Sequence, residues 1–434
     1  MSITLTTVIL FAVFGVLLFL GVPISISIVV SSIVTAMSTL SWDQITFITM
    51  QKMNSGVESF SLLAVPLFIL AGNIMNNGGI AKRLVNFAQL FVGKIPGSMA
   101  QANILGNMLF GALSGSSVAA ASAMGGCISP IEEENGYDPA SSAAANIASA
   151  PTGLLIPPTS AFIVYSTVAG GVSISTLFMA GYIPGIIWAL CCCVVGVLLA
   201  VKLGYKGTPG KFDWKNLGIC TLRALPSLSL IIVVIGGIIG GVFSATEGSA
   251  IAVVYALILA FCYRSINLKS LWKIIVDSAK MSGMVVFLVG VSNILGWVMA
   301  FLQIPDAVAA ALLSLTSNKY IILLIMNVIL LVSGTFMDVT PAILIFTPLF
   351  LPICQSFGMS TIQFGLILVY NLCIGNITPP VGNALFVGIK VGRTSLSKVM
   401  PYMLMYYVAI IGGLLLVTFI PAVSTALPQA MGLM

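Results

Sequence analysis

Two short motifs occur twice in this chain, once in each half, and both interrupt the regular helix that apolar sequence favours. Leu113-Ser114-Gly115-Ser116 recurs as Val332-Ser333-Gly334-Thr335, and Ile156-Pro157-Pro158 recurs as Thr378-Pro379-Pro380. The spacing is nearly the same, because Pro157 follows Ser114 by 43 positions and Pro379 follows Ser333 by 46. Hydrocarbon tolerates broken backbone only where it is buried in protein or lines a watery cavity. The repetition therefore predicts a binding site built from two halves.

The sequence around these motifs is strongly apolar. Hydrophobic residues make up 59% of the 434 residues and charged residues 6%, against about a quarter charged in soluble domains. We therefore expect an all-α polytopic membrane protein. The 17 basic residues are scattered rather than gathered on one face, so no nucleic-acid partner is expected. The absence of histidine excludes histidine-based catalysis and metal sites, and the cysteines lack the spacing of a zinc site.

The apolar stretches sort into two matching series, each with a re-entrant hairpin and a helix broken at Pro-Pro. The expected ranges are 1–201 for the first repeat, with its hairpin at 98–130 and broken helix at 139–169, 202–223 for a polar linker, and 224–434 for the second repeat, with its hairpin at 320–353 and broken helix at 361–389. Further breaks are expected near Gly21-Val22-Pro23 and Gly240-Gly241.

Basic residues predict the orientation, because short cytoplasmic loops are enriched in Lys and Arg. A cytoplasmic linker and two hairpins that return to their own side make the two five-span halves inverted, with both termini outside. Fifteen of the 17 basic residues then lie inside and only Lys52 and Lys319 outside. The fifteen are Lys202, Lys206, Lys211, Lys215 and Arg223 in the linker, and Lys82, Arg83, Lys94, Arg264, Lys269, Lys273, Lys280, Lys390, Arg393 and Lys398 elsewhere. Inverted repeats with discontinuous helices are typical of secondary transporters.

The Ser-Gly motifs are expected at the hairpin tips. Gly115 and Gly334 would let the chain reverse there, since glycine adopts backbone conformations closed to other residues. Hydroxyl oxygens beside unpaired carbonyls suit a hard cation, and they come from Ser114, Ser116, Ser117, Ser333 and Thr335. The alternative is that these small residues only allow close helix packing.

The Pro-Pro motifs are expected to split a span into two half-helices, because proline lacks an amide hydrogen and clashes with the preceding turn. The opposed half-helix ends would offer carbonyls to a cation and amides to an anion. Flanking polar side chains fit this use: Asn146, Thr152, Thr159 and Ser160 in the first half, and Asn371, Asn376, Thr378 and Asn383 in the second. The alternative is a simple kink.

Few acidic residues lie in apolar sequence, where an ionised carboxylate is costly unless paired. Asp338 follows the second Ser-Gly motif and is a candidate cation ligand or proton carrier, or a carboxylate neutralised by neighbouring hydroxyls and amides. Glu247 is the next acid expected to be buried. The acidic run 132–134 is expected in a solvated loop, and Asp138-Pro139 has the pattern of an N-cap followed by the first helical residue.

At these residues the chain resembles the large membrane subunit of the tripartite ATP-independent periplasmic (TRAP) transporters, typified by C4-dicarboxylate and sialic acid uptake systems. The resemblance covers essentially the whole chain. It rests on Leu113-Ser114-Gly115-Ser116-Ser117, Gly153-Leu154-Leu155-Ile156-Pro157-Pro158-Thr159, Ser333-Gly334-Thr335-Phe336-Met337-Asp338 and Gly375-Asn376-Ile377-Thr378-Pro379-Pro380-Val381-Gly382.

The resemblance implies sodium-coupled uptake of an organic acid across the bacterial inner membrane, by an elevator-type transport domain that moves against a scaffold. It implies a periplasmic binding protein and a small four-helix membrane subunit as partners, the latter a separate chain because residue 1 begins directly with the large-subunit pattern. No cofactor beyond sodium is expected. One sodium site would use Ser114, Gly115, Ser116, Ser117, Thr152 and Pro157, and the other Ser333, Gly334, Thr335, Asp338, Gly375, Asn376 and Thr378. Substrate would contact Ser116, Thr159, Thr335, Pro379 and Asn383.

Four other functions remain open from the residues. A stand-alone divalent-anion symporter of similar architecture would bind free substrate, and a proton-coupled version would use Asp338. An intramembrane hydrolase is disfavoured, because no histidine, nearby lysine base or aspartate pair accompanies the hairpin serines. A channel is disfavoured because inverted discontinuous repeats serve alternating access.

Overall fold

The computed structural model describes residues 3–92, 95–205, 207, 214–316 and 318–434, and within this part every regular element is a helix. Three basic residues used to predict the orientation, Lys94, Lys206 and Lys211, lie outside the described residues. The helical composition agrees with the predicted fold class.

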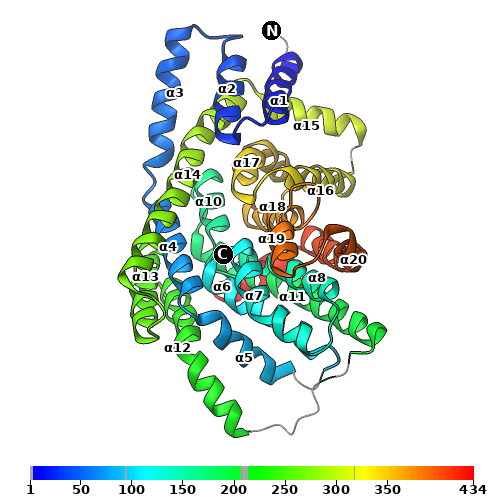
Figure 1. Cartoon of the computed structure of the whole chain (residues 1–434). Helices are drawn as coiled ribbons and strands as arrows, with labels where there is room; N and C mark the ends of the chain where they lie inside the picture. The colour runs from blue at the N-terminus through cyan, green and yellow to red at the C-terminus, as the bar shows by residue number, and fades with distance from the viewer. Residues whose placement is uncertain (1–2, 93–94, 206, 208–213, 317) are drawn as a thin grey trace.

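The first half begins with two short apolar helices and ends with one long one (Figure 1). The break predicted near Gly21 is present, between α1 and α2. The helices are α1 (Ile3–Phe19), α2 (Ile24–Ala36), α3 (Trp42–Val57), η1 (Phe60–Leu63), α4 (Ala64–Asn77), α5 (Ile80–Val92), α6 (Ser98–Ser114), α7 (Ser117–Glu134), α8 (Pro139–Ser149), α9 (Thr152–Leu155), α10 (Ser160–Val168) and α11 (Ile174–Leu203).

The second half contains the predicted break at Gly240-Gly241, between α12 and α13. Its first helix begins at Trp214, inside the range predicted as linker. The helices are α12 (Trp214–Ile239), α13 (Ala245–Cys262), α14 (Leu268–Phe301), α15 (Ile304–Leu315), α16 (Lys319–Phe336), α17 (Val339–Ser356), α18 (Thr361–Asn376), α19 (Asn383–Val391), α20 (Leu396–Phe419) and α21 (Pro421–Ala430).

Seven helices among the described residues are long and apolar enough to cross a membrane, and an eighth span is formed if 139–155 and 160–168, bent by 47°, are taken together. The chain is therefore a multi-pass membrane protein. Apolar runs do not predict α3 and α5, because these helices carry polar residues at intervals, whereas α15 is apolar but only 12 residues long.

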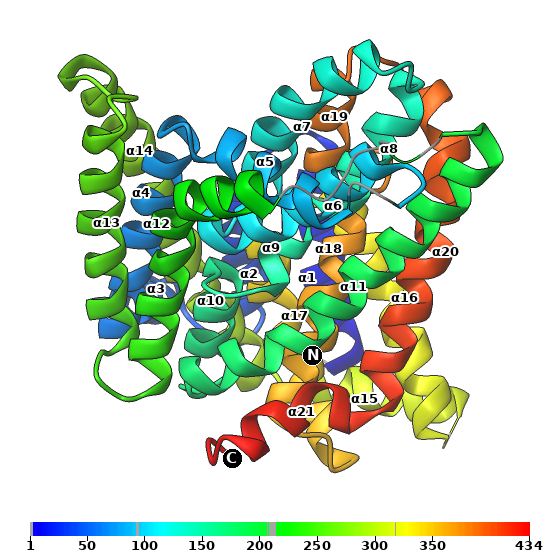
Figure 2. The same ribbon diagram turned by 90° about the horizontal axis from the view of Figure 1, so that it is seen from below.

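The helices form two groups, which both views separate (Figures 1 and 2). We call α3, α4, α12, α13 and α14 the side layer, since these helices pack on one another along one flank. The main body contains α6–α11 and α16–α20. Within it the two halves interlock, because α10 packs on α17 and α19 packs on α7. The side layer meets the main body where α4 packs on α6 and α10, and where α14 packs on α17.

Candidate functional site

The first hairpin reverses at Gly115, as predicted. Its φ of 62° lies in the left-handed region, which glycine enters without the penalty that a β-carbon brings. Ser116 then caps α7, its Oγ accepting a hydrogen bond from the Ala119 amide at 3.3 Å. The Oγ of Ser114 is buried and has no hydrogen-bond partner among the described residues. This tip therefore holds one unused hydroxyl.

The second hairpin reverses elsewhere than predicted. Gly334 is not at the tip, because α16 continues to Phe336 and the chain turns at Met337 and Asp338. The glycine instead packs against Gly375 of α18: a β-carbon built on Gly375 would lie 2.3 Å from the Gly334 carbonyl carbon. Ser333 and Thr335 are correspondingly in the last turn of α16, where the Thr335 hydroxyl donates to the Val332 carbonyl at 2.7 Å.

A second close glycine pair, Gly111 with Gly153, lies in the first half. A β-carbon on either would lie 2.5 Å from the other's Cα. Gly153 precedes Pro157 by four residues, and Gly375 precedes Pro379 by four. The close glycine contacts thus pin each hairpin to its broken helix just before the break, and Asp338 occupies the N-cap position that Ser116 has in the first half.

The helices are interrupted at both Pro-Pro motifs, as predicted. Pro157-Pro158 separates α9 from α10, and Pro379-Pro380 separates α18 from α19; both Pro-Pro peptide bonds are cis. Thr159 is fully buried, and its hydroxyl oxygen caps α10 by accepting from the Ala161 amide at 3.2 Å. The breaks therefore create two new helix N-termini, a buried one at α10 and a more exposed one at α19.

The hydroxyls of Thr152 and Thr378 are used within their own helices. Thr152 Oγ1 donates to the Ser149 carbonyl and Thr378 Oγ1 to the Ile374 carbonyl, each at 2.7 Å. These bonds leave the lone pairs of each oxygen available to a ligand.

Asn376 joins the two halves at the site. Its Nδ2 donates to Ser117 Oγ of the first hairpin at 2.7 Å, and its Oδ1 accepts from the Ala384 amide at the start of α19 at 3.3 Å. Asn376 and Ser117 are both buried. One side chain therefore holds the first hairpin against the broken helix of the second half.

A cavity of about 440 Å³ lies where these elements meet. It brings together Ser114, Gly115, Ser116, Ser117, Asp338, Asn376 and Asn383 from the predicted site, with Pro158 and Ser160 beside them. The remaining predicted residues do not line it: Thr152, Pro157, Thr159, Ser333, Gly334, Thr335, Gly375, Thr378 and Pro379. These nine belong to the helix ends and breaks that adjoin the lining residues in the sequence.

Four helices begin at this cavity. Its lining includes first-turn residues of α7, α17, α10 and α19, namely Val118, Val339, Ala161 and Asn383. A helix N-terminus carries partial positive charge and free amides, which favour an anion. Asp338 is the one charged side chain among the lining residues, and its Oδ1 accepts from Asn383 Nδ2 at 3.4 Å.

The side layer closes the cavity with residues that the sequence did not single out. They come from α4 and α14: Phe68, Ile69, Gly72, Asn73, Asn76, Met281 and Val285. Asn73 is tied to α14 by a 2.8 Å hydrogen bond from its Nδ2 to Ser278 Oγ. Three asparagines inside the apolar stretch 60–77, of which Asn73 and Asn76 line the cavity, were the available signal, because polar groups in a span need a partner.

Two of the flanking asparagines serve packing rather than the cavity. Asn107 Nδ2 on α6 donates to Asn146 Oδ1 on α8 at 2.9 Å. In the second half Asn371 Nδ2 donates to Asn327 Oδ1 on α16, also at 2.9 Å. Neither Asn146 nor Asn371 lines the cavity, and each fastens a hairpin to a broken helix, while their expected use at the site stays a prediction.

The acidic residues depart from expectation in opposite senses. Glu132 is not in a solvated loop, because α7 extends through Glu134 and Glu132 is only 1% exposed. Glu247 is exposed rather than buried, and it completes a capping box with Ser244 at the start of α13. Asp138 and Pro139 start α8 as predicted, with Asp138 Oδ2 accepting from the Ser141 amide at 3.0 Å.

Comparison with solved structures shows a shared fold. The structure of the Alcanivorax borkumensis YdaH transporter resembles this chain with a TM-score of 0.65 and 13% sequence identity, over 87% of this chain and 89% of that one. At this identity the likeness concerns the fold alone.

Sequence comparisons identify the family. The family model described as "Tripartite ATP-independent periplasmic transporter, DctM component" matches residues 11–423. The chain is 48% identical to the Salmonella typhimurium protein YgiK, over 97% of both. It is 36% identical to the C4-dicarboxylate TRAP transporter large permease protein DctM of Pseudomonas aeruginosa, over 87% of this chain and 88% of that one. It is also 36% identical to the isethionate TRAP transporter permease protein DctMQ of Oleidesulfovibrio alaskensis, over 96% of this chain but 65% of that one. The chain therefore belongs to the DctM component family of the TRAP transporters, and it is a transporter permease rather than an enzyme.

Proposed function

We propose that this chain is the large permease of a sodium-coupled importer for a small organic acid in the bacterial inner membrane. The observation that carries the proposal is the convergence of four helix N-termini and Asp338 on one cavity. No Lys or Arg is among the residues that line it. An acid bound there would be held by main-chain amides and hydroxyls instead of a basic side chain.

Sodium fits the same arrangement because a lone carboxylate and an organic anion in one cavity would repel each other. A bound cation beside Asp338 would cancel that repulsion, so sodium and substrate would each strengthen the binding of the other. Oxygen ligands for a hard cation are present at both tips. We assign one sodium site to the hydroxyls and carbonyls of 114–117 with the break at Pro157, and the other to Asp338 with 333–335 and 375–378.

The two sites would be unequal. Asp338 stands at the N-cap of α17 without a side-chain bond to the helix, whereas Ser116 at the same position in the first half caps its own helix. One site would therefore have a charged ligand, whereas the ligands of the other would all be neutral. The first site would depend on hydroxyls and carbonyls, and the second on a carboxylate.

Movement of the main body against the side layer would carry the cavity across the membrane. We propose two inverted repeats, 1–201 and 224–434, with the linker cytoplasmic and both termini periplasmic. The matching order of hairpin and broken helix in each half, and the two glycine pairs, support this division. The cavity lies between α4 and α14 of the side layer and the hairpin tips, as an elevator requires.

The partners would be a small four-helix membrane subunit and a periplasmic binding protein that delivers the acid. The family description names a tripartite system. The DctMQ relative is longer than this chain, and its extra length has room for a second subunit. Relatives named for isethionate and C4-dicarboxylates suggest small sulfonates and carboxylates as first substrates to test, with sialic acid as a third.

The decisive experiment is uptake into proteoliposomes that contain the chain, its small subunit and the binding protein loaded with isethionate, succinate or sialic acid. We expect uptake driven by a sodium gradient, and sodium dependence weakened by Asp338→Asn but not by Asp306→Asn, an exposed acid on α15. Equal sodium activation in both variants would reject the assignment of Asp338.

Two further outcomes would replace the proposal. Sodium-driven uptake of free substrate without the binding protein would identify a stand-alone anion symporter. Uptake driven by a pH gradient in sodium-free buffer would identify proton coupling.

A further inference from the structure

A second polar cluster lies away from the tips, around Glu132 in the last turn of α7. The carboxyl group is buried, and neither oxygen has a hydrogen-bond partner among the described residues. Asn103 Nδ2 of α6 and Ser142 Oγ of α8 are also buried and also lack a partner. Both side chains lie beside the carboxyl group. Three unsatisfied groups that face one another in the interior would cost several kcal/mol together unless something joins them.

Among the described residues, no basic side chain lies within ion-pair distance of this carboxyl group. Helices α6, α8 and α9, which pack on α7, contain no charged residue. On α5, Arg83 is stacked on the Tyr263 ring, 3.2 Å from its centre. The other titratable groups around Glu132 are Tyr137, Tyr205 and Tyr406, Glu133, Glu134 and Cys127 on α7, Asp138 at the start of α8, Lys390 in the last turn of α19 and Arg393 just beyond that helix.

Burial without a countercharge disfavours the ionised form. It raises the pKa of the Glu132 carboxyl group from an ordinary 4.5 to about 7. The hydrogen-bonding capacity of Ser142 and Asn103 opposes this rise without cancelling it.

The donors around Glu132 suit a proton rather than a metal ion. Asn103 Oδ1 already accepts from Asn107 Nδ2 at 3.1 Å, so the amide turns its NH2 group to the carboxyl group. A metal ion would meet that donor, whereas a protonated carboxyl group can accept from Asn103 and donate to Ser142 Oγ. In the ionised form both neighbours can donate. The two states therefore differ by one proton and the rotation of one hydroxyl.

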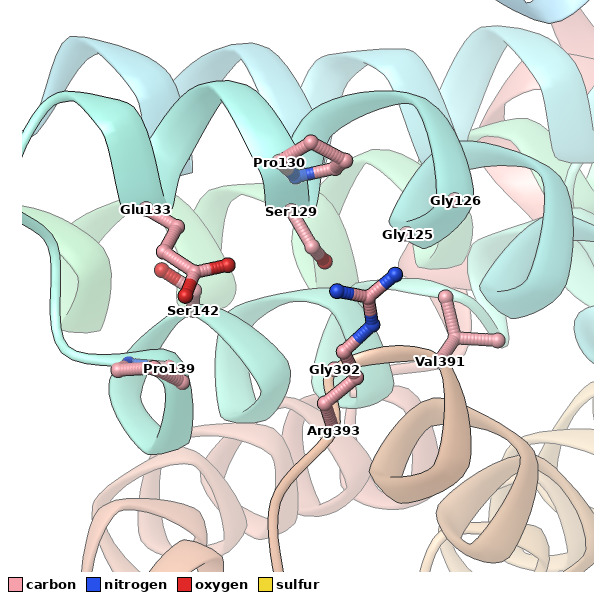
Figure 3. Close-up of a pocket in the computed structure, with 10 residues that line it drawn as sticks. All are labelled: Gly125, Gly126, Ser129, Pro130, Glu133, Pro139, Ser142, Val391, Gly392 and Arg393. Atoms are coloured by element: carbon pink, nitrogen blue, oxygen red, sulfur yellow. The ribbon is translucent and has the colours of Figure 1, made fainter.

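Ser142 also connects Glu132 to a cavity. It lines a space of about 120 Å³ at the junction of α7, α8 and the end of α19, together with Ser129, Glu133 and Arg393 (Figure 3). One water needs only about 10–15 Å³ of such space, so the cavity has room for several waters that could carry a proton. Figure 3 shows the Arg393 guanidinium pointing into this space across from Glu133 and Ser142.

We propose that Glu132 is a proton-binding site of this permease, which exchanges its proton with solvent through Ser142 and this cavity. Hydrogen bonds connect this site to the first hairpin. Asn107 Nδ2 donates to Asn103 Oδ1, and it also donates to Asn146 Oδ1 and Ser149 Oγ at 2.9 Å each. That network fastens α6 to α8. The protonation state of Glu132 therefore biases how firmly the first hairpin is held, independently of the sodium sites.

The pH dependence has a definite sign. The carboxyl pKa is higher in the folded protein than in the unfolded chain, so folding takes up a proton between about pH 4.5 and 7. Thermal stability should therefore fall as the pH rises through this window and level off above it. In Glu132→Gln this fall should shrink, whereas Glu133→Gln, which changes an exposed neighbour, should retain the wild-type curve.

Infrared difference titration of the purified full chain tests the site directly, through the C=O stretch of a protonated carboxyl group. We expect a band that disappears with a midpoint near pH 7 in wild type and Glu133→Gln and that is missing in Glu132→Gln. Ser142→Ala, which removes a donor to the carboxylate, should raise the midpoint. A band unchanged in Glu132→Gln, or none titrating near pH 7 in wild type, would overturn the proposal. So would a midpoint that falls as sodium replaces choline, since that would place a metal ion in the site.

Discussion

Gly375 offers the sharpest test of the packing that shapes the site. The methyl group of Gly375→Ala would lie 2.3 Å from the Gly334 carbonyl carbon, 2.5 Å from its Cα and 2.6 Å from its oxygen. All three are backbone atoms, so no side-chain rotation relieves the clash. Ordinary contact begins at 3.4 Å, and α16 and α18 would have to separate by about 1 Å, because cores do not absorb an extra methyl group otherwise.

The separation has a second cost. Asn371 Nδ2 and Asn327 Oδ1 join the same two helices at 2.9 Å, and a further ~1 Å takes them out of hydrogen-bonding range. Overpacking costs about 1–3 kcal/mol and the lost bond about 1 kcal/mol, while alanine regains about 1 kcal/mol of helix propensity. We expect a net destabilisation of about 1–3 kcal/mol.

Two companion glycines provide the controls. Gly334→Ala meets the Gly375 Cα at 3.2 Å and a movable Leu372 methyl at 3.4 Å, so it should cost less than Gly375→Ala. Gly126→Ala in α7 meets nothing within 4 Å and should stabilise by about 0.5–1 kcal/mol.

The assay is the thermal unfolding midpoint of the purified chain in nanodiscs, with pH and sodium held constant because bound ions shift it. The expected order is Gly126→Ala highest, then wild type, then Gly334→Ala, with Gly375→Ala lowest. A Gly375→Ala midpoint equal to wild type would refute the close contact and the reasoning built on it.

Two further predictions concern contacts around the cavity. Asn376→Ala leaves Ser117 and the Ala384 amide without their partner and should cost about 1–3 kcal/mol, measured as a lower unfolding midpoint, while a wild-type midpoint would contradict the link. Gly72→Ala places a methyl group 2.6 Å from the Ser114 carbonyl oxygen and should slow uptake about tenfold, since ~1.4 kcal/mol of clash shifts a conformational equilibrium by that factor. Gly283→Ala on α14, which meets nothing within 4 Å, should leave uptake unchanged, and equal rates in both variants would refute a contact at Gly72.

The contrast between Gly115 and Gly334 shows how far local pattern reaches. Both follow serine in an apolar run, yet one adopts the left-handed turn and the other lies in a helix against a facing glycine. Glycine is compatible with both a left-handed turn and a helix, so the sequence alone does not predict which conformation each glycine adopts. The choice depends on the approach of α18, which is a tertiary contact.

Glu132 makes the same point for charge. An acidic run before Asp138-Pro139 looks solvated, because burying a carboxylate without a partner is costly. Its burial arises when α6 and α8 pack on α7 and place Asn103 and Ser142 beside it. No sequence spacing predicts the burial of Glu132, since Asn103 and Ser142 lie 29 and 10 residues away from Glu132 in the sequence.

The sequence by itself determined the membrane class, the two broken helices and the cap at Asp138, because each depends on residues that are adjacent in the chain. Long apolar runs partition into the bilayer, and tandem prolines interrupt a helix. Only the tertiary structure decided which residues share the cavity, that Asp338 stands where the first half has Ser116, and that Glu132 is buried. These are contacts between helices far apart in the chain, and they depend on how closely the helices approach rather than on what any one segment prefers.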